Sequence, residues 1–266
     1  NRCLFLRAAV VVPAPARKAR RDTRPQVMRH MLAGSVALIV GRAGHVVETG
    51  TWNLLFCGHG LIDTNIYYRG GGVVFPLYIR DVGKKKQPIR GGGGIVVNLA
   101  LFESRPDYTV LRPNLSPKFI AAVEGKLGLG FVQKGAGDFQ SSLGPEDVFH
   151  YIYAILHSPT YRVRYAEFLK IDFPRIPLTS DREQFKALAG KGEELAALHL
   201  MEAPALNKLT TEFPVSGSSE VVSLRYTEPQ GDVRGRVYIN KAQYFEGIEP
   251  EVWEFQIGGY QVLHKW

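Results

Sequence analysis

The sequence predicts an α+β protein, in which a mixed-β part is followed by a helical scaffold that carries a β-hairpin. Three observations support this class: β-branched and aromatic runs recur over residues 35–79, capped amphipathic helices follow residue 116, and apolar residues alternate between 222 and 239. The chain has 266 residues, of which 45% are hydrophobic, so it can bury a substantial core. We expect two parts, residues 1–143 and residues 144–266.

The first part is predicted to contain strands that are separated by glycine-rich connections. Strand character follows from β-branched and aromatic side chains in three runs, residues 35–40, 46–56 and 73–79. The glycine runs Gly70–Gly72 and Gly91–Gly94 cannot hold a regular element, so they predict connections. Neither run has the spacing of a Walker loop or of a dinucleotide-binding loop.

Helices are predicted where a capping position precedes proline. Ser116 and Pro117 open a helix that ends before Gly128. Pro145 opens a second helix, with acidic residues in its first turn. A short third helix begins at Ser158-Pro159, and the two prolines within residues 169–178 then require an extended segment.

A long helix, a hairpin and a final helical stretch are predicted to complete the chain. Residues 180–183 fit a capping box, and the helix after them presents an apolar face made of Phe185, Leu188, Leu195 and Leu198. A turn at residues 229–232 joins two alternating strands, residues 222–226 and 237–239. Pro250 begins the last helical stretch.

Charge is divided unequally along the chain. Residues 1–137 contain 20 Lys and Arg against 7 Asp and Glu, whereas residues 138–266 contain 13 against 18. The net charges are therefore +13 and −5, which give the +8 of the whole chain. A basic half supplies the salt-sensitive part of binding to a polyanion, and it favours nucleic acid as a partner over a merely solvated surface.

Several activities are disfavoured by what the sequence lacks. It has no Asn/Asp-Pro-Pro-aromatic methyltransferase motif, no P-loop and no zinc-protease motif, and its seven histidines do not pair at metal-ligand spacing. We therefore expect neither catalysis by this chain alone nor a metal or cofactor within it. Two cysteines and short apolar runs predict a cytoplasmic protein without a membrane segment. Its ends, Asn1 and Trp266, suggest a piece of a longer protein.

One segment and several shorter blocks carry a family resemblance. Residues 148–178 read VFHYIYAILHSPTYRVRYAEFLKIDFPRIPL, with a helix, a short corner, a second helix and an extended segment. The shorter blocks are residues 24–32, 75–78, 114–116, 236–241, 243–247 and 253–262. Together they resemble the C-terminal specificity domain of type ISP single-chain restriction–modification enzymes, from about the first tenth of the chain to its end.

The resemblance implies a role in the recognition of a DNA target. Full-length members of this family combine an N6-adenine methyltransferase with an ATP-driven translocase and a nuclease, and their last domain selects the DNA sequence. The implied partners are double-stranded DNA and the methyltransferase domain of the same chain, in a prokaryotic cytoplasm. S-adenosylmethionine, ATP and Mg²⁺ would belong to the rest of the parent protein, and this fragment would hold no cofactor.

Candidate contacts follow from the chemistry of DNA recognition, in which cations on phosphates fix the register and a few side chains read base edges. For phosphates we select cations in glycine-flanked or proline-flanked loops: Arg17, Lys18, Arg20, Arg21, Lys84, Lys85, Lys86 and Arg90. For base edges we select arginines of the basic half: Arg24, Arg29, Arg69, Arg105 and Arg112. A solvated loop explains Lys84–Lys86 nearly as well, and each arginine could instead pair with a carboxylate or a phosphate.

Two other functions stay open from the sequence. The chain could be part of a methyltransferase catalytic unit, which predicts binding of S-adenosylmethionine. It could also be an RNA-binding or protein-docking module, although no aromatic platform for single strands is evident. Tyr161 and Tyr165 share a predicted helix face. The two arginines between them could touch the DNA backbone or form ion pairs with Glu167 and Asp172, and we favour the structural interpretation.

Overall fold

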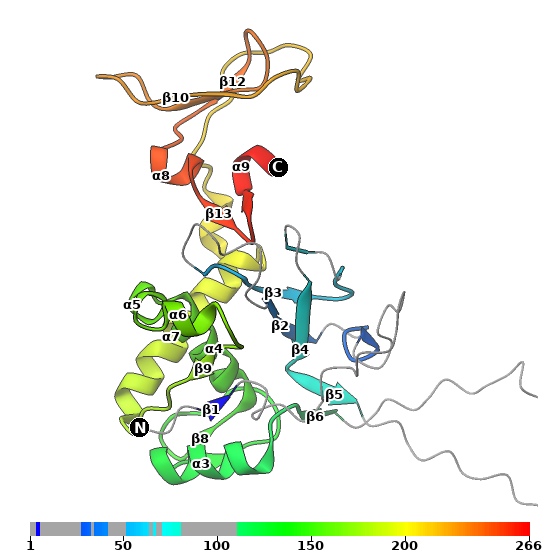
Figure 1. The fold of residues 1–266 in the computed structure, drawn as a ribbon, viewed down its shortest axis with the longest axis vertical. Helices are drawn as coiled ribbons and strands as arrows, with labels where there is room; N and C mark the ends of the chain where they lie inside the picture. Colours follow the sequence, from blue (N-terminus) through cyan, green and yellow to red (C-terminus); the bar gives the residue numbers. More distant parts are fainter. Residues whose placement is uncertain are drawn as a thin grey trace, which may run out of the picture.

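The computed structural model describes residues 28–32, 35–41, 52–63, 66–67, 71–80 and 111–266, together with the backbone of Leu4 and Phe5. Helices and small, mostly antiparallel sheets make up these residues, which confirms the α+β class. Figure 1 shows a main body of helices and strands, with the sheet β10–β12 standing apart from it at one end of the long axis.

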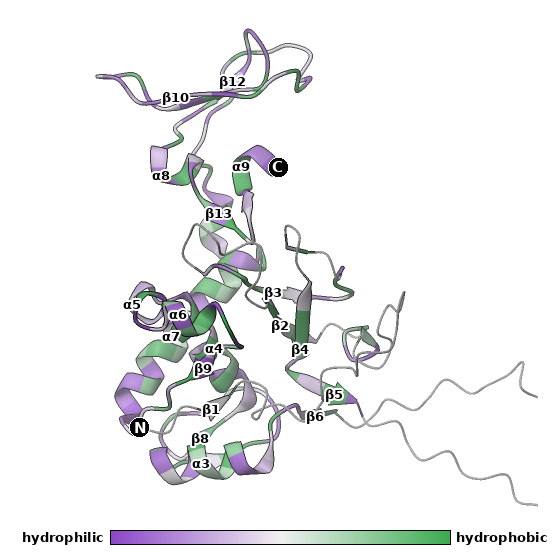
Figure 2. Cartoon of the chain, in the orientation of Figure 1, coloured by the Kyte–Doolittle hydropathy of each residue, from purple (hydrophilic) through white to green (hydrophobic). Residues whose placement is uncertain are grey.

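A three-stranded antiparallel sheet forms one side of the main body. β2 (Val36–Gly41) lies at its centre, between β3 (Leu55–His59) and β4 (Gly72–Pro76). All β2 residues except the first are buried, as expected for a central strand of apolar side chains, and Figure 2 shows hydrophobic residues along β2 and β4. The prediction of a strand over residues 35–40 is confirmed.

The other two strand predictions need correction. Within the predicted strand 46–56, residues 52–54 have no strand pairing, β3 begins only at Leu55, and residues 46–51 lie outside the described ranges. The predicted strand 73–79 is divided at Leu77, because β4 pairs with β2 whereas β5 (Tyr78–Arg80) pairs with β6 (Leu111–Pro113). Pro76 still pairs with Ala37, and the Leu77 N–H donates to the Val36 carbonyl of β2 at 2.9 Å while the Leu77 carbonyl accepts the Asn114 N–H at 2.9 Å, so the chain passes from one ladder to the other at Leu77.

Three helices begin at the predicted prolines: α3 (Pro117–Leu127), α4 (Pro145–His157) and α5 (Pro159–Arg164). The hydroxyl groups of Ser116 and Ser158 each accept a backbone N–H of the first turn at 3.3 Å. A single helical turn, α6 (Ala166–Leu169), and a further turn over residues 170–172 occupy the start of the segment that was predicted to be extended, so that prediction holds only for residues 173–178. In that segment β9 (Arg175–Ile176) pairs with β1 (Leu4–Phe5).

In the connection between α3 and α4, the short strands β7 (Gly130–Phe131) and β8 (Ser142–Leu143) pair in parallel. Two carboxylates, Asp138 and Asp147, hold this connection in place through hydrogen bonds to backbone N–H groups. Asp138 accepts the backbone N–H groups of Ser141, Ser142 and Gln140 at 2.9 Å each, and these bonds lower its pKa far below the usual range. Asp147 accepts N–H groups of two glycines at 2.6 and 2.7 Å, and its burial raises its pKa. The loop therefore closes onto the start of α4.

The long helix α7 (Arg182–His199) packs against α4. Its N-cap is Asp181, one residue later than the predicted capping box, because the Asp181 carboxylate accepts the N–H of Gln184 at 3.0 Å. Its buried residues are Phe185, Ala189, Gly192 and Ala196. Small residues lie here because the helices approach closely: a Cβ on Gly192 would lie 2.6 Å from the carbonyl carbon of His150. Of the predicted leucines, Leu188 and Leu195 are partly buried against the core, whereas Leu198 is exposed.

One hydrophobic core joins the sheet to the helices. It contains Leu38, Ile39 and Val40 of β2, residues of α3 and α4, and Phe185 of α7. Residues on both sides of position 143 therefore share this core. The division into residues 1–143 and 144–266 stays a prediction.

Residues 200–266 extend beyond this core. After a 3-10 turn at Pro204–Asn207, a sheet forms in the order β10 (Arg225–Thr227), β11 (Arg236–Tyr238), β12 (Tyr244–Glu246). It confirms the predicted hairpin and adds a third strand. The helix predicted at Pro250 is only the turn α8 (Pro250–Trp253). Gly258 and Gly259, with φ of 60° and 84°, then reverse the chain between β13 (Gln256–Ile257) and β14 (Tyr260–Gln261), before α9 (Val262–Lys265).

Candidate nucleic-acid interface

Most of the predicted contact residues lie outside the described part of the chain. These are Arg17, Lys18, Arg20, Arg21, Arg24, Arg69, Lys84, Lys85, Lys86, Arg90 and Arg105. The structure places the remaining two, Arg29 and Arg112, and both lie at the ladder formed by β5 and β6.

Arg29 lies beside β5 because a buried turn anchors its neighbours. Met28 and Met31 are buried in a small apolar cluster with β2, and the Met31 N–H donates to the Met28 carbonyl at 2.9 Å. His30 is 3% exposed and accepts the backbone N–H of Arg80 at Nδ1, at 3.0 Å. The Arg29 Nε lies 3.4 Å from His30 Nε2, which keeps the guanidinium near the end of β5.

Arg112 lies on the neighbouring strand. It is the β6 partner of Ile79, while Arg80 pairs with Leu111. Directly opposed residues share a face of a sheet, so Arg112 and Arg80 project from opposite faces of the ladder. We call Arg29, Arg80 and Arg112 the β5–β6 basic site. In the sequence, β5 and β6 are joined by residues 81–110, which include the predicted cations Lys84, Lys85, Lys86, Arg90 and Arg105.

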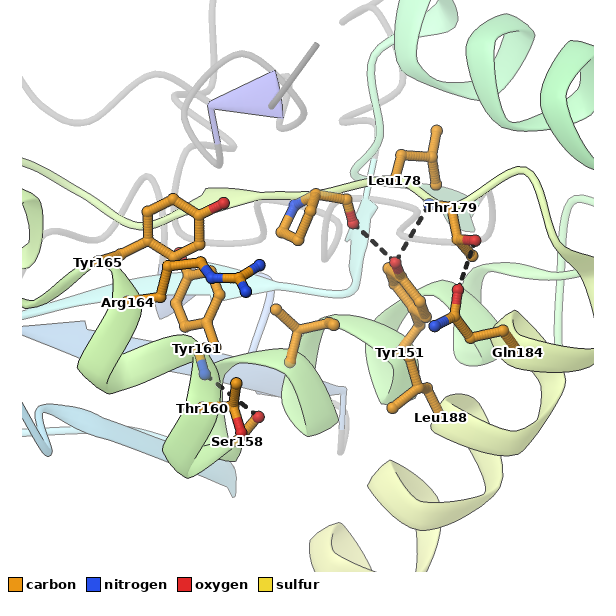
Figure 3. A pocket seen from close by; sticks show the side chains of 12 residues that line it. Tyr151, Ser158, Thr160, Tyr161, Arg164, Tyr165, Leu178, Thr179, Gln184 and Leu188 are labelled. Atoms are coloured by element: carbon orange, nitrogen blue, oxygen red, sulfur yellow. Dashed lines mark hydrogen bonds between the residues drawn. The ribbon is translucent and has the colours of Figure 1, made fainter. Parts of the chain in front are cut away.

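A pocket of about 470 Å³ opens between α4, α5, α7 and the extended segment (Figure 3). On one wall the Tyr151 hydroxyl donates to the Pro177 carbonyl at 2.7 Å and accepts the Thr179 N–H at 3.4 Å. The Thr179 hydroxyl donates to Gln184 Oε1 at 2.7 Å. Because these polar groups bond to one another, this wall offers few free groups to a ligand.

Arg164 and Tyr165 line the opposite wall, at the end of α5. The rings of Tyr161 and Tyr165 are 4.8 Å apart, which confirms their shared face. Arg164 is exposed and has no carboxylate partner within the described ranges, because Glu167 pairs with Lys170 at 2.6 Å. The predicted ion pair is therefore wrong for Arg164, and this wall can accept a small anion.

Arg162, in contrast, points into the protein. Its Nε donates to the Leu156 carbonyl at 2.7 Å, and its Nη2 lies 3.1 Å from His157 Nδ1. Burial lowers the pKa of His157 to about 3, and the charges of Arg162 and His199 add to this effect. His199 Nδ1 lies 2.5 Å from the Tyr153 hydroxyl, and burial also lowers the pKa of His199. Both histidines are thus neutral at pH 7, and Arg162 is a structural cation.

A further cationic surface lies on the sheet β10–β12. Arg225 is paired with Tyr238, which is paired with Tyr244, so their side chains form one row on one face. The Arg225 guanidinium carbon lies 4.1 Å from the centre of the Tyr238 ring, and that of Arg236 lies 4.5 Å from the Tyr244 ring. The two tyrosine rings are 5.0 Å apart. We call these four residues the Arg–Tyr face.

The sequence contains a signal for the Arg–Tyr face, although charge alone does not reveal it. The predicted turn fixes the register, because Gln230 pairs with Val233, and counting outward from this pair sets Arg225 opposite Tyr238. Arg80 carried no such signal, because its position depends on the pairing of β5 with a strand that follows 30 residues later.

Two other kinds of site find no support in the ranges that the structure describes. No group of three His, Cys, Asp or Glu side chains there is arranged to hold a metal ion. No helix among the same residues is both long and apolar enough to cross a membrane.

Residues 13–266 match a family described as the Type ISP C-terminal specificity domain. No curated protein matches the chain. Among solved structures, the ATP-dependent Type ISP restriction-modification enzyme LlaBIII bound to DNA is similar over 92% of this chain, with a TM-score of 0.59 and 16% sequence identity. The DrdV–DNA complex is similar over 88% of the chain, with a TM-score of 0.53 and 18% identity.

A third structure, a nuclease-deletion mutant of the Type ISP enzyme LlaGI in complex with a DNA substrate mimic, covers 88% of the chain with a TM-score of 0.49 and 18% identity. The chain spans 13% of LlaBIII, 20% of DrdV and 14% of the LlaGI mutant. At these identities the likeness to LlaBIII and DrdV establishes a common fold.

Proposed function

The chain belongs to the family of Type ISP C-terminal specificity domains, and from this membership we propose that it recognises a target sequence in double-stranded DNA for a restriction–modification enzyme. The observation that carries the proposal is the family match, which extends over residues 13–266. The proteins LlaBIII and DrdV, which share this fold over one part of their length, were solved with DNA.

The distribution of charge supports the proposal. The net charge of +13 in residues 1–137 is suited to the phosphates of a duplex, whose neutralisation makes binding sensitive to salt. The β5–β6 basic site belongs to this half and flanks a segment that contains five predicted contact cations. We propose that the loop cations hold phosphates, and that Arg29 and Arg112 are among the residues that reach base edges.

The roles of the parent protein belong to the same proposal. We expect an N6-adenine methyltransferase domain in the same chain, which would use S-adenosylmethionine, and we expect ATP and Mg²⁺ to serve a translocase and nuclease where the parent has them. The specificity domain would then act in the cytoplasm of a prokaryote, without a cofactor of its own. Calorimetry with S-adenosylmethionine should accordingly show no binding to residues 1–266.

Selection from a random duplex library tests sequence recognition directly. The immobilised chain should enrich one DNA motif over successive rounds, and a duplex with that motif should compete better than scrambled duplex, single-stranded DNA or RNA of the same length. Enrichment of no motif, or stronger competition by RNA, would contradict the proposal. RNA preference would favour the RNA-binding alternative instead.

The loop cations can be tested against a matched cation outside the proposed interface. Replacing Lys84, Lys85 and Lys86 with alanine should weaken binding to all duplexes and reduce the salt slope of log K by about one unit for each phosphate that is no longer neutralised. Lys191→Ala is the control, because Lys191 is exposed and pairs with Glu194 at 2.9 Å on α7. Equal effects of the triple variant and the control would refute the assignment of these lysines.

A further inference from the structure

The sheet β10–β12 has two chemically different faces. One face carries Tyr226, Val237 and Phe245, which stand opposite one another in the ladder. Val237 is buried, and the Tyr226 hydroxyl donates to the Ile248 carbonyl at 2.9 Å, so this face is used in packing. The other side is the Arg–Tyr face, completed by Thr227 and Glu246 at its neighbouring positions.

The geometry of the Arg–Tyr face leaves one guanidinium available. A guanidinium that stacks on an aromatic ring is held by its flat side, so its N–H groups still point outward in its own plane. The guanidinium of Arg236 is already engaged, because its Nε donates a hydrogen bond to the Glu246 carboxylate at 2.6 Å. Arg225 is exposed, and among the residues that the structure describes no carboxylate pairs with it. Within the described part of the chain, Arg225 is therefore a preorganised donor without a carboxylate acceptor.

We propose that the Arg–Tyr face binds the sugar–phosphate backbone of the duplex, with the Arg225 guanidinium on a phosphate and the Tyr238 and Tyr244 hydroxyls beside it. This inference rests on the proposed function and assigns a DNA contact to the half of the chain that has a net charge of −5. We had expected that half to be a scaffold. The exposed Lys241, in the turn between β11 and β12, adds a further cation at the edge of the face.

The composition of the face favours nucleic acid over a protein partner. Its side chains are two arginines, two tyrosines, a threonine and a carboxylate that is already paired, with no aliphatic residue among them. Tyrosine and arginine are also enriched at protein–protein interfaces, but the centre of such an interface is usually apolar, and this face has no aliphatic side chain to form one. Phosphate recognition, in contrast, uses arginine forks and tyrosine hydroxyls, which are the groups that this face presents.

Arg225→Ala tests the contact, and Arg234→Ala is its matched control. Both variants remove one positive charge from the same small sheet region. The Arg234 guanidinium, however, is occupied by the Glu212 carboxylate at 2.9 Å and by the Thr210 carbonyl at 3.2 Å. In fluorescence anisotropy with duplex DNA, Arg225→Ala should weaken binding about tenfold and reduce the salt slope by about one, whereas Arg234→Ala should change affinity less than about twofold. Arg225→Lys should retain the slope but not the full affinity.

The outcomes separate this inference from the proposed function. If the unaltered chain binds duplex DNA and Arg225→Ala behaves like Arg234→Ala, the Arg–Tyr face does not contact DNA, while the proposed function stands. A loss of affinity with an unchanged salt slope, or with a lower melting temperature, would show that Arg225 acts on the fold, and would also overturn the inference. If the unaltered chain shows no preference for duplex DNA, the proposed function itself fails.

Discussion

Replacing Gly192 with alanine tests how closely α4 and α7 are packed. The added Cβ would lie 2.6 Å from the His150 carbonyl carbon and nearer still to its oxygen, and the obstacle is backbone that cannot rotate away. Accommodating extra atoms in a packed interface costs about 1–3 kcal/mol, and a separation of the helices by 0.5–1 Å forfeits about a quarter to a half of each dispersion contact. Alanine gains about 1 kcal/mol of helix propensity over glycine. With the steric cost at the top of its range, about 3 kcal/mol, we therefore expect a net destabilisation of about 2 kcal/mol.

Gly190 provides the internal comparison, because it lies in the same helix and a Cβ there would meet nothing within 4 Å. Gly190→Ala should therefore show the propensity gain alone, about 0.5–1 kcal/mol of added stability. Urea denaturation followed by far-UV circular dichroism measures the stability of both variants. In thermal unfolding, the melting temperature of Gly192→Ala should fall by about 4–8 °C. If the two variants had equal stability, the close approach of α4 and α7 would be wrong.

Two further predictions concern buried ionisable groups. The folded protein holds the pKa of His157 at about 3, so between pH 6.5 and pH 3 the unfolded chain binds one proton more than the folded chain. The free energy of unfolding should therefore fall by about 1.4 kcal/mol per pH unit as the pH is lowered through this window. His157→Gln should make the measured slope less steep by about one proton, and an unchanged slope would assign the effect to other groups. Asp147→Ala leaves the N–H groups of Gly137 and Gly144 without their acceptor, so it should cost about 2–4 kcal/mol in urea denaturation, while a loss below about 0.5 kcal/mol would show that water replaces the carboxylate.

Local chemistry explains which parts of the fold could be predicted from the sequence. The starts of α3, α4 and α5 are fixed by proline at the first helical position and by neighbouring capping groups, all within a few residues. The hairpin β10–β11 was equally local, because its turn contains Gly231 at φ 56°. In each case the residues that decide the structure are adjacent in the chain.

Interactions between distant segments explain what could not be predicted. The buried side of α7 was only partly predicted, because leucines indicate a core face in general, whereas the proximity of α4 places the smaller residues Ala189, Gly192 and Ala196 at the closest contact. The last predicted helix was shortened to α8, since the Gly258–Gly259 turn makes a hairpin that docks on Asn53, whose Nδ2 donates to the Gln256 carbonyl at 2.9 Å. In both cases the contacting element, α4 for α7 and Asn53 for the last hairpin, lies in a different segment of the chain.

The candidate interface also has one part that the sequence indicated and another that depends on contacts between distant segments. Charge composition favoured nucleic acid, which is the partner that we propose, but it directed attention to the basic half. The Arg–Tyr face depends on strand register, which the net charge of a segment does not reveal. Arg29 and Arg112 were selected as separate residues, and only the fold places both beside the ladder that contains Arg80, with Arg112 and Arg80 on its opposite faces.

The pairing of Arg80 with Leu111 has a consequence for how such proteins diversify. The two attachment points of residues 81–110 are neighbours on adjacent strands, and the entropy of closing a chain between fixed neighbours rises only slowly with its length. Recombination could therefore replace residues 81–110 with a longer or shorter segment while the hydrophobic core keeps its structure. A lineage with such an insertion point can acquire new preferences by exchange of one segment instead of by many coordinated substitutions.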